Sequence, residues 1–457
     1  MTRINADSMT GLDLTFSMSA SQPCIEVSQL FPIRVIRGKE NMKTTAFAYF
    51  ACFAVLLPLP SLAAVPEYPY YGNAPADMLP YRNIEPYYRY WLTRLPFRGP
   101  GRDYPDPTNL TSLKVGLLSP PPYGPEAKRG EMSRRGVMLA FDEANASRSP
   151  GAGELPFEVI EKADSPQWGS AANIAVEFAD KEVLGFIGTI DGDATHVALR
   201  VALKIETFMV NCSDPDPTLT ETQIPWLLRI FPDNRQQGYR LASLMVKEKK
   251  LKRIVVLRSN SRPGRVGVRP FVDAVRRLGF PILQEINFKD GERSFGTQVA
   301  VIKQADPEAV VFWGNPAETA AVAAELRAAG VKAAFFGFDR LVDPEFVRLA
   351  GAAAEGATAT YFYDPAKKDP QWTDFRQRFE KRYGQEPDIY AGYGYDAARL
   401  LIDAIKKAGP NKYRVHDQLT SLDEYHGVTG YMRFDGRWDN IAPVVTAHCN
   451  HGKWLFE

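Results

Sequence analysis

Residues 155–195 read LPFEVIEKADSPQWGSAANIAVEFADKEVLGFIGTIDGDAT, and this stretch decides the fold class. Short apolar runs at 157–161 (FEVIE) and 184–188 (LGFIG) enclose a segment at 171–181 that has the alanine-rich composition of a helix. A strand, a helix and a second strand in this order are typical of a βαβ unit, whose two strands run parallel. The stretch therefore predicts an α/β fold built on a parallel sheet.

The same alternation of apolar runs and helix-length segments continues on both sides of this stretch. The further apolar runs are 114–118, 208–211, 253–257, 309–314 and 333–338, and the further helical segments are 131–145, 236–249, 266–278 and 317–329. These are too many strands for one sheet, and 457 residues exceed what a single core usually supports. We therefore expect two Rossmann-like lobes with parallel sheets.

The chain is expected to pass between the two lobes three times. The segment 227–233 (LLRIFPD) separates the two series of strands and makes the first crossing. A helical stretch at 370–408 follows the second series, so the chain returns to the first lobe and leaves it again before its last strands. The predicted lobes are 113–233 plus 362–428 and 234–361 plus 429–457.

The residues before the first lobe divide into three parts. Residues 42–63 begin with a basic residue, continue as an apolar run and end in small residues, which predicts a signal peptide cleaved after Ala63. A transmembrane anchor is the alternative, but it needs about 20 apolar residues, and this run is shorter and contains two prolines. Residues 1–41 are then a leader that is not native to the exported protein. Residues 64–112 form a Tyr/Pro-rich arm that either wraps a lobe or docks a partner.

Export predicts the compartment and the redox state of the mature protein. We expect a monomer in the periplasm that is not embedded in a membrane. Cys212 and Cys449 are the cysteines that follow the signal peptide, and an oxidising compartment permits a disulfide between them. Whether they pair depends on a distance that the sequence does not contain.

Composition and motifs argue against several classes of function. Lys and Arg number 55 and Asp and Glu number 54, so a net charge of +1 gives no electrostatic case for a nucleic-acid partner. The sequence has no GxxxxGK[ST], no strand-linked GxGxxG, no HExxH and no GxSxG. The run His448-Cys449-Asn450-His451 fits no common zinc spacing. We expect a protein that is not an enzyme and that carries no cofactor and no metal.

The loops at the carboxyl ends of the strands are the candidate binding site, because open parallel sheets bind ligands there. In the loop TIDGDAT, Thr189 offers a hydroxyl group, Asp191 a carboxylate and Gly192 its backbone groups. Asp193 is expected to cap the helix that follows. The loop NCSDPDP at 211–217 holds two prolines and is either a preformed wall or an ordinary turn.

A single carboxylate and several aromatic residues complete the set of candidates. Asp339 lies in the apolar setting FFGFDRL and is suited to receive a cationic amine, although pairing with Arg340 or capping of the next helix competes. The aromatic side chains of Tyr123, Trp313 and Tyr390 would enclose the apolar part of a ligand or belong to the core.

Over residues 114–455 the chain resembles the leucine/isoleucine/valine-binding family of type I periplasmic solute-binding proteins. The resemblance rests on the order of several segments, which are KVGLLSPPPYGP, FDEANA, the stretch quoted first, FMVNCSDPDPTLT, RIFPDNRQQG, AVVFWGNPAETAAVAAELRAAGV, FFGFDRLVDPEFVRLAG and IYAGYGYDAARLLIDAIKKAG. It implies two lobes joined by three hinge strands, closure around a small-molecule ligand and delivery to an ABC transporter permease.

The resemblance also implies which residues contact the ligand. The family holds the ligand's carboxylate with hydroxyl residues at two strand ends, where this chain has Gly192 or Asp193 before Thr195 and has Ser213-Asp214-Pro215. Two further positions retain the family's residue type: Asp339, which would meet the ligand's ammonium group, and Tyr390, the aromatic residue at a helix start. At a third position, Asn315 replaces an aromatic wall. These departures widen the expected ligand to a small polar solute that is amino acid-like, an amide or related.

Three functions are compatible with these observations. The leading hypothesis is the periplasmic substrate-binding component of an ABC importer. The alternatives are a ligand sensor that reports to a regulator, or an accessory protein of a periplasmic metabolic system that docks a partner through residues 64–112.

Overall fold

The structure of this chain is a computed structural model that describes residues 100–149, 151, 153–167 and 169–457. The predicted leader at 1–41, the predicted signal peptide at 42–63 and the part of the arm before Pro100 lie outside the described residues. Within the described residues, none of the helices combines the length and the apolar character needed to span a bilayer.

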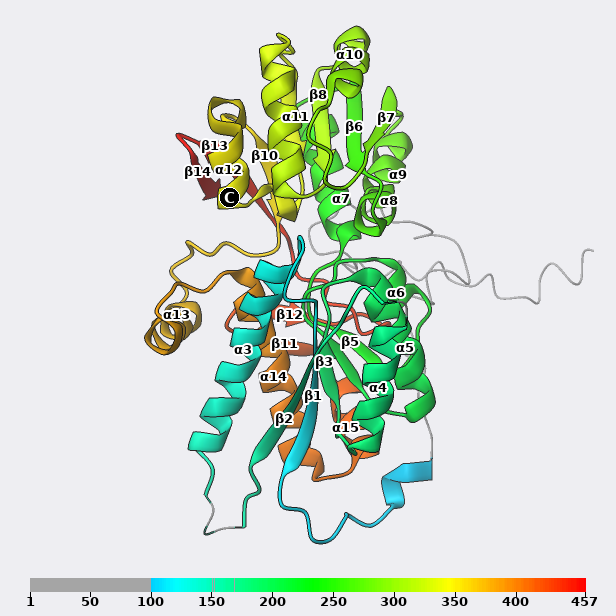
Figure 1. Cartoon of the computed structure of the whole chain (residues 1–457), viewed down its shortest axis with the longest axis vertical. Helices are drawn as coiled ribbons and strands as arrows, with labels where there is room; N and C mark the ends of the chain where they lie inside the picture. Colours follow the sequence, from blue (N-terminus) through cyan, green and yellow to red (C-terminus); the bar gives the residue numbers. More distant parts are fainter. Residues whose placement is uncertain (1–99, 150, 152, 168) are drawn as a thin grey trace, which may run out of the picture. The chain divides into compact units, whose positions relative to one another are not determined.

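The strands form two large sheets and one hairpin, and helices lie between them in sequence, which confirms the predicted α/β class (Figure 1). The five-stranded sheet has the order β2-β1-β3-β4-β5 and consists of β1 (Leu113–Ser119), β2 (Phe157–Ala163), β3 (Phe186–Gly188), β4 (Met209–Asn211) and β5 (Leu227–Arg229). The seven-stranded sheet has the order β14-β13-β10-β9-β8-β6-β7 and consists of β6 (Ile254–Ser259), β7 (Gln284–Phe288), β8 (Ala309–Trp313), β9 (Ala334–Gly337), β10 (Thr358–Tyr361), β13 (Val445–Asn450) and β14 (Lys453–Phe456). The hairpin pairs β11 (Glu424–Gly427) with β12 (Gly430–Arg433).

The predicted helical segments coincide with helices, and the structure adds helices that were not predicted, such as Gly296–Ala305 and Lys412–Thr420. Those that pack with the first sheet are α3 (Ala127–Ala146), α4 (Ser170–Asp180), α5 (Gly192–Ile205), α6 (Thr218–Glu221), α13 (Pro370–Tyr383), α14 (Ile389–Ala408) and α15 (Lys412–Thr420). Those that pack with the second are α7 (Asn234–Ala242), the π-helical η5 (Ser243–Glu248), α8 (Arg262–Gly267), α9 (Arg269–Arg277), α10 (Gly296–Ala305), α11 (Pro316–Ala328) and α12 (Pro344–Ala350). Short 3₁₀ turns add η3 (Pro100–Asp103), η6 (Asp339–Leu341) and η7 (Gly351–Ala354).

The first lobe is a parallel sheet covered by helices on both faces, as its continuous apolar strands predict. One face packs against α3 and α14, which lie side by side in Figure 1, and the other packs against α4 and α5. Two glycines set the spacing of α3 and α14. A Cβ on Gly136 would overlap the Ala391 carbonyl oxygen, and one on Gly394 would overlap the Ser133 carbonyl oxygen. The two helix backbones are therefore in direct contact at this crossing.

The second lobe also has helices on both faces of its sheet. Residues such as Phe271 on α9 and Trp313 on β8 form the core of one face, and Ile302, Leu326 and Phe346 form that of the other. At one edge, β13 pairs antiparallel with β10, and β14 pairs antiparallel with β13. Strands β7 and β10 were not predicted: the residues of β7 are mostly exposed, and those of β10, although buried, form no apolar run.

The third crossing lies later in the chain than residue 428. The hairpin joins residues on both sides of that position, and a further bridge pairs Asp439 with Arg229 at the end of β5. The segment from 430 to 440 therefore pairs with elements of the first lobe. Strands β13 and β14 pair with the second lobe, in agreement with the prediction for the chain's last strands.

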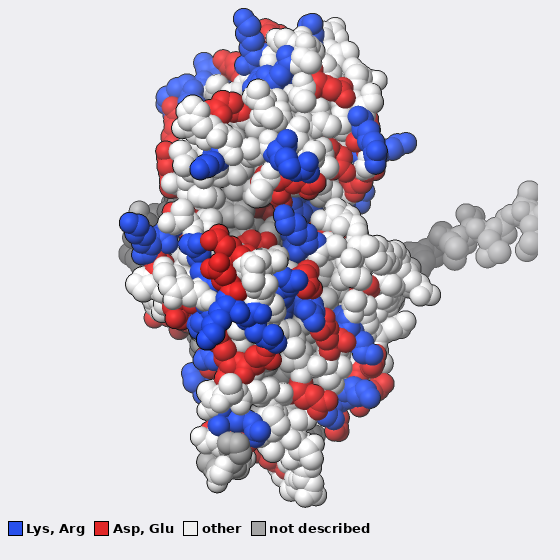
Figure 2. All heavy atoms as spheres, turned by 60° about the vertical axis from the view of Figure 1, so that its left-hand side comes forward, with Lys and Arg blue, Asp and Glu red and all other residues white. Residues whose placement is uncertain are grey.

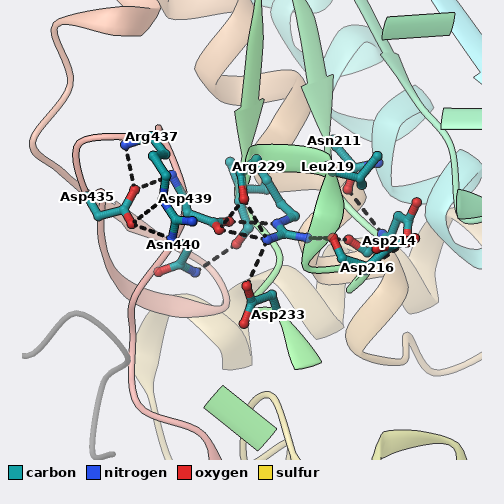
Figure 3. Close-up of polar contacts among 12 residues, drawn as sticks. Asn211, Asp214, Asp216, Leu219, Arg229, Asp233, Asp435, Arg437, Asp439 and Asn440 are labelled. Atoms are coloured by element: carbon teal, nitrogen blue, oxygen red, sulfur yellow. Dashed lines mark hydrogen bonds and ion pairs between the residues drawn. The ribbon is translucent and has the colours of Figure 1, made fainter. Parts of the chain in front are cut away.

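A buried ion cluster joins the first and third crossings (Figure 3). The Arg229 guanidinium donates to both carboxylate oxygens of Asp439, at 2.6 and 2.7 Å, and to Asp233 at 3.0 Å. Arg235 also donates to Asp439, at 2.8 Å. Burial by itself would raise the pKa of Asp439, but the guanidinium groups of Arg229 and Arg235 lower it below its ordinary value.

The second crossing packs against the first through aromatic rings. Phe362 follows β10, and its ring lies 4.1 Å from the ring of Phe231, measured between centroids. The three crossings thus share one buried pivot that is ionic on one side and aromatic on the other.

Cys212 and Cys449 are both free and buried. They belong to the cores of different lobes, so the structure does not form the disulfide that the sequence left open.

Candidate functional site

The loops at the carboxyl ends of the two sheets face each other and are joined by ion pairs. Arg262, which follows β6, donates through Nε to Asp216 of the first lobe at 2.7 Å. Arg340 in η6 pairs with Glu126, which precedes α3, and with Asn315 at 2.7 Å. These contacts define two walls, one on each lobe, and all the predicted site residues lie on or beside them. Figure 2 shows acidic and basic side chains interspersed over one face of the molecule.

Asp339 and Tyr390 meet across the two lobes. The Tyr390 hydroxyl donates to Asp339 Oδ2 at 3.2 Å, and the Gln237 amide donates to Oδ1 at 3.1 Å. Asp339 does not form an ion pair with Arg340. It does not cap the next helix either, because Asp343 caps α12. Tyr390 also stacks on Phe231 of the pivot, with ring centroids 5.7 Å apart. The contact therefore connects this part of the site to the hinge.

The helix that starts at the end of β3 is capped by Asp191 and not by Asp193, which corrects the prediction. Asp191 Oδ1 accepts from the backbone N–H groups of Asp193 and Ala194, at 2.8 and 3.1 Å. Asp193 is the second residue of the helix, and its exposed side chain pairs with Arg262 at 3.4 Å. Either aspartate of the loop TIDGDAT suits a cap by residue type, and the helix start at Gly192 decides between them.

The remaining residues of this loop and Asn315 are held by the protein itself. Thr195 is fully buried and donates to the Asp191 carbonyl at 2.7 Å. Gly192 leaves space for the Asp216–Arg262 pair, because a Cβ there would lie 2.9 Å from Asp216 Oδ2. Asn315 precedes α11 and accepts from Arg340.

Two residues of the first wall have polar atoms without a partner. Thr189 is buried, and its hydroxyl makes no hydrogen bond within the described residues. Asp214 is buried as well; its Oδ1 accepts from the Asp216 N–H at 3.0 Å, while its Oδ2 has no partner there. Ser213 beside it is buried; its hydroxyl lies 3.9 Å from the Cys212 sulfur, and its backbone N–H donates to Asn211 Oδ1 at 3.3 Å.

Burial raises the pKa of Asp214 to about 8, and the nearby charge of Asp216 adds to the rise. Burial would also raise the pKa of Glu126, but Arg340 and Arg129 reverse this and lower it. The first wall therefore presents a buried carboxyl group, Asp214, that forms no ion pair within the described residues, beside Asp216 and Glu126, which arginines neutralise.

The walls enclose one small cavity and border a larger hollow. The cavity has a volume of about 20 Å³ and is lined by Gly192, Asp214, Asp216, Arg262 and Arg340, among others. The hollow has a volume of about 810 Å³, and Tyr123 and Asp191 line it together with Arg262. Tyr123 is exposed, and Trp313 packs on Phe338 in the core of the second lobe.

The structure brings the predicted residues into three neighbouring groups. Asp339, Tyr390 and Asn315 surround Arg340 and Gln237, Gly192 and Asp214 line the cavity, and Tyr123 and Asp191 line the hollow. The sequence analysis missed the charged residues that connect the lobes, which are Glu126, Arg129, Asp216, Arg262 and Arg340. Their loops were identified as strand ends, but the pairing between them spans up to 214 positions and has no local signal.

Replacing Asp214 with asparagine is expected to stabilise the protein more at pH 8 than at pH 5. The pKa of Asp214 is higher in the folded protein than its unfolded value of 3.8. Such an acid destabilises the folded state at any pH above the unfolded pKa, and the destabilisation grows until the pH reaches the folded pKa. We expect the gain from Asp214→Asn to be larger at pH 8 by about 1–3 kcal/mol. Urea unfolding at both pH values measures it, with Asp180→Asn on the exposed surface of α4 as the control. An equal gain at both pH values would contradict the raised pKa.

Comparison with known proteins follows this geometry. A family model described as periplasmic binding protein matches residues 112–447. The Leu/Ile/Val-binding protein homolog 2 of Brucella abortus is 25% identical over 76% of this chain and 92% of its own length. The leucine-, isoleucine-, valine-, threonine- and alanine-binding protein of Pseudomonas aeruginosa is 22% identical, over 72% of this chain and 87% of its own.

Solved structures share the fold at low sequence identity. The leucine-binding protein LivK of Thermotoga maritima superposes with a TM-score of 0.68 at 24% identity, over 76% of this chain and 97% of its own. A solute-binding protein of an ABC transporter from Rhodopseudomonas palustris, solved with benzoate, has a TM-score of 0.67 at 19% identity, over 76% and 95% of the two chains. These likenesses confirm two lobes with parallel-stranded sheets.

Proposed function

This chain belongs to the periplasmic binding protein family, and from that premise we propose that it is the substrate-binding component of an ABC importer, which holds a small polar solute between its two lobes. The similar proteins are named for leucine, isoleucine and valine, and similar structures hold isoleucine or benzoate, so members of this fold accept different small ligands. Family and fold are those of solute-binding proteins. We propose that this chain likewise binds its solute without catalysing a reaction.

The observation that carries the proposal is the contact between Asp339 and Tyr390. It joins a carboxylate of the second lobe to a hydroxyl of the first at 3.2 Å, and both side chains are buried. A solute that bears an ammonium or amide group and binds to Asp339 would therefore contact both lobes. Such differential contact is what stabilises a closed form over an open one.

The location, the partner and the lobe boundaries belong to the same proposal. We propose a monomer in the periplasm, cleaved after Ala63, that delivers its solute to a permease. Its first lobe comprises 113–233 plus 362–440, and its second comprises 234–361 plus 441–457; these boundaries follow the hairpin and the Asp439 bridge.

A second candidate function uses the arm to dock a partner. The described end of the arm is fixed to the first lobe, since Arg102 donates to Asp417 at 2.6 Å and Asn411 donates to the Gly101 carbonyl at 3.0 Å. Tyr104 remains 56% exposed beside Tyr413, with ring centroids 6.2 Å apart. An exposed aromatic ring on a fixed segment is suited to contact another protein.

A thermal-shift screen followed by titration calorimetry tests the import hypothesis. Amino acids, amides, amino alcohols and small acids are added in excess, and a ligand at 100 times its Kd is expected to add about 2.7 kcal/mol of stability. Asp339→Asn is then expected to weaken an amine-bearing ligand about ten- to one-hundredfold, because it removes a charged hydrogen bond.

The control is Glu345→Gln, which removes an exposed carboxylate from the adjacent helix α12. It should leave the Kd unchanged. The import hypothesis fails if no compound raises the melting temperature while removal of residues 64–112 abolishes capture of a partner protein. Unchanged affinity in Asp339→Asn would exclude Asp339 from the site.

A further inference from the structure

Three buried side chains without hydrogen-bond partners lie at the ends of neighbouring strands in the first lobe. Ser119 ends β1, Thr189 follows β3, and Asp214 follows β4, and these strands are adjacent in the sheet. Their atoms Ser119 Oγ, Thr189 Oγ1 and Asp214 Oδ2 have no partner within the described residues. Each residue is at least nine-tenths buried. Buried polar groups are normally satisfied, so three exceptions at neighbouring strand ends, of which Asp214 lines the small cavity, point to a ligand.

The charges around the small cavity show what kind of group is missing. Asp216 is neutralised by Arg262 at 2.7 Å, and Arg340 is neutralised by Glu126. Asp214 is the carboxyl group of the lining that no arginine contacts through its side chain. A solute carboxylate placed here would add a further acid to this wall, whereas an N–H or O–H group would satisfy Asp214.

We propose that the wall formed by Ser119, Thr189 and Asp214 binds a hydrogen-bond donor of the solute, which is an amine, an amide N–H or a hydroxyl, and discriminates against a free carboxylate. This rests on the proposed function and names the class of its ligand. The contacts between the lobes also match acids of the first lobe with hydrogen-bond donors. The guanidinium groups of Arg262 and Arg340 on the second lobe donate to Asp216 and Glu126 on the first.

The solute reaches this wall only when the interlobe ion pairs separate. A cavity of about 20 Å³ has room for about one water molecule. Opening withdraws Arg262 from Asp216, which leaves this carboxylate beside Asp214 in the lining of the cavity. A donor-bearing solute then takes the place of the arginine, while a solute carboxylate is repelled by both acids.

Matched compounds that differ only at the carboxyl group test this. Wild-type protein is titrated at pH 7 with L-leucine, L-leucinamide and L-leucinol, with L-alanine, L-alaninamide and L-alaninol, and with L-arginine and agmatine. In the series that fits the pocket, the amide, amino alcohol or agmatine is expected to bind at least tenfold more tightly than the acid. Asp214→Thr, which restores a hydroxyl in place of the carboxyl group, is expected to reverse this order.

The control is Asp180→Thr on the exposed face of α4, which should leave every ratio unchanged. Asp214→Thr removes a destabilising buried acid, so denaturation curves are expected to show a folded variant. The proposal is overturned if the acid binds as tightly as its amide in the wild type, or if Asp214→Thr leaves the ratio of their affinities unchanged. Binding of the acid alone overturns this proposal and leaves the import function standing. Absence of binding by these compounds and by the wider panel overturns this proposal; together with loss of partner capture when residues 64–112 are removed, it overturns the import hypothesis as well.

Discussion

Replacing Arg229 with alanine is expected to lower the free energy of unfolding by about 3–5 kcal/mol. The guanidinium has no exposed surface and donates to Asp439 through two nitrogens and to Asp233. Removing it leaves these carboxylates buried with less than their full charge compensation, which Arg235 and Arg437 then supply only in part. The loss exceeds the net value of the ion pair, because the stranded charges account for most of it.

Urea or guanidinium unfolding measures the change in the free energy of unfolding, and two further variants serve as comparisons. Arg348→Ala removes an arginine that is 68% exposed and pairs with Glu345 at 3.7 Å, and it should change stability by less than about 0.5 kcal/mol. The double variant Arg229→Leu with Asp439→Leu should be more stable than the sum of its single changes predicts. A loss below about 1 kcal/mol in Arg229→Ala would show that the cluster does not hold the crossings together.

Replacing Gly136 with valine is the second large expected effect, a loss of about 3 kcal/mol or more. A Cβ at this position would overlap the Ala391 carbonyl oxygen of α14, and backbone cannot move aside as a side chain can. The two helices must separate, and they carry residues of the candidate site: Arg129 lies on α3 and Tyr390 on α14. We therefore expect solute affinity to fall together with stability.

The smaller change Gly136→Ala separates packing from helix propensity. Alanine favours a helix over glycine by about 0.5–1 kcal/mol, so stabilisation would show that the helices are not in close contact. We expect destabilisation instead. Ala146→Val, on the exposed end of the same helix α3, is the control for a β-branched residue and should cost less than about 1 kcal/mol.

Many of the strands that are buried on both faces could be predicted from the sequence. The runs at 114–118, 253–257 and 309–314 coincide with strands because such strands contain no exposed positions to interrupt the apolar pattern. Strand β7 was missed because its side chains are mostly exposed, and β10 was missed because its residues TATY, although buried, form no apolar run. The position of the third crossing has no local signal in the sequence, because the pairing of Asp439 with Arg229 joins residues 210 positions apart.

The candidate site could be predicted as a set of loops but not as a set of contacts. The order of strands identifies the loops that hold Thr189, Asp214 and Asp339, because ligands bind at the carboxyl ends of parallel strands. Which side chains face one another depends on how two lobes meet. Arg262 and Arg340 therefore had no signal beyond their place in those loops, and their partners Asp216 and Glu126 belong to the other lobe.

The pairing of Arg229 with Asp439 also limits how this lineage can diverge. Loss of either residue alone strands a buried charge, whereas joint replacement by apolar residues of similar size is close to neutral. Selection therefore acts on the two positions as a single inherited character, and substitutions at 229 and 439 should occur together across descendants. The path between an ionic and an apolar pivot passes through an unstable ancestor, so the change is rare. The pair should consequently mark old branches of the family and not recent ones.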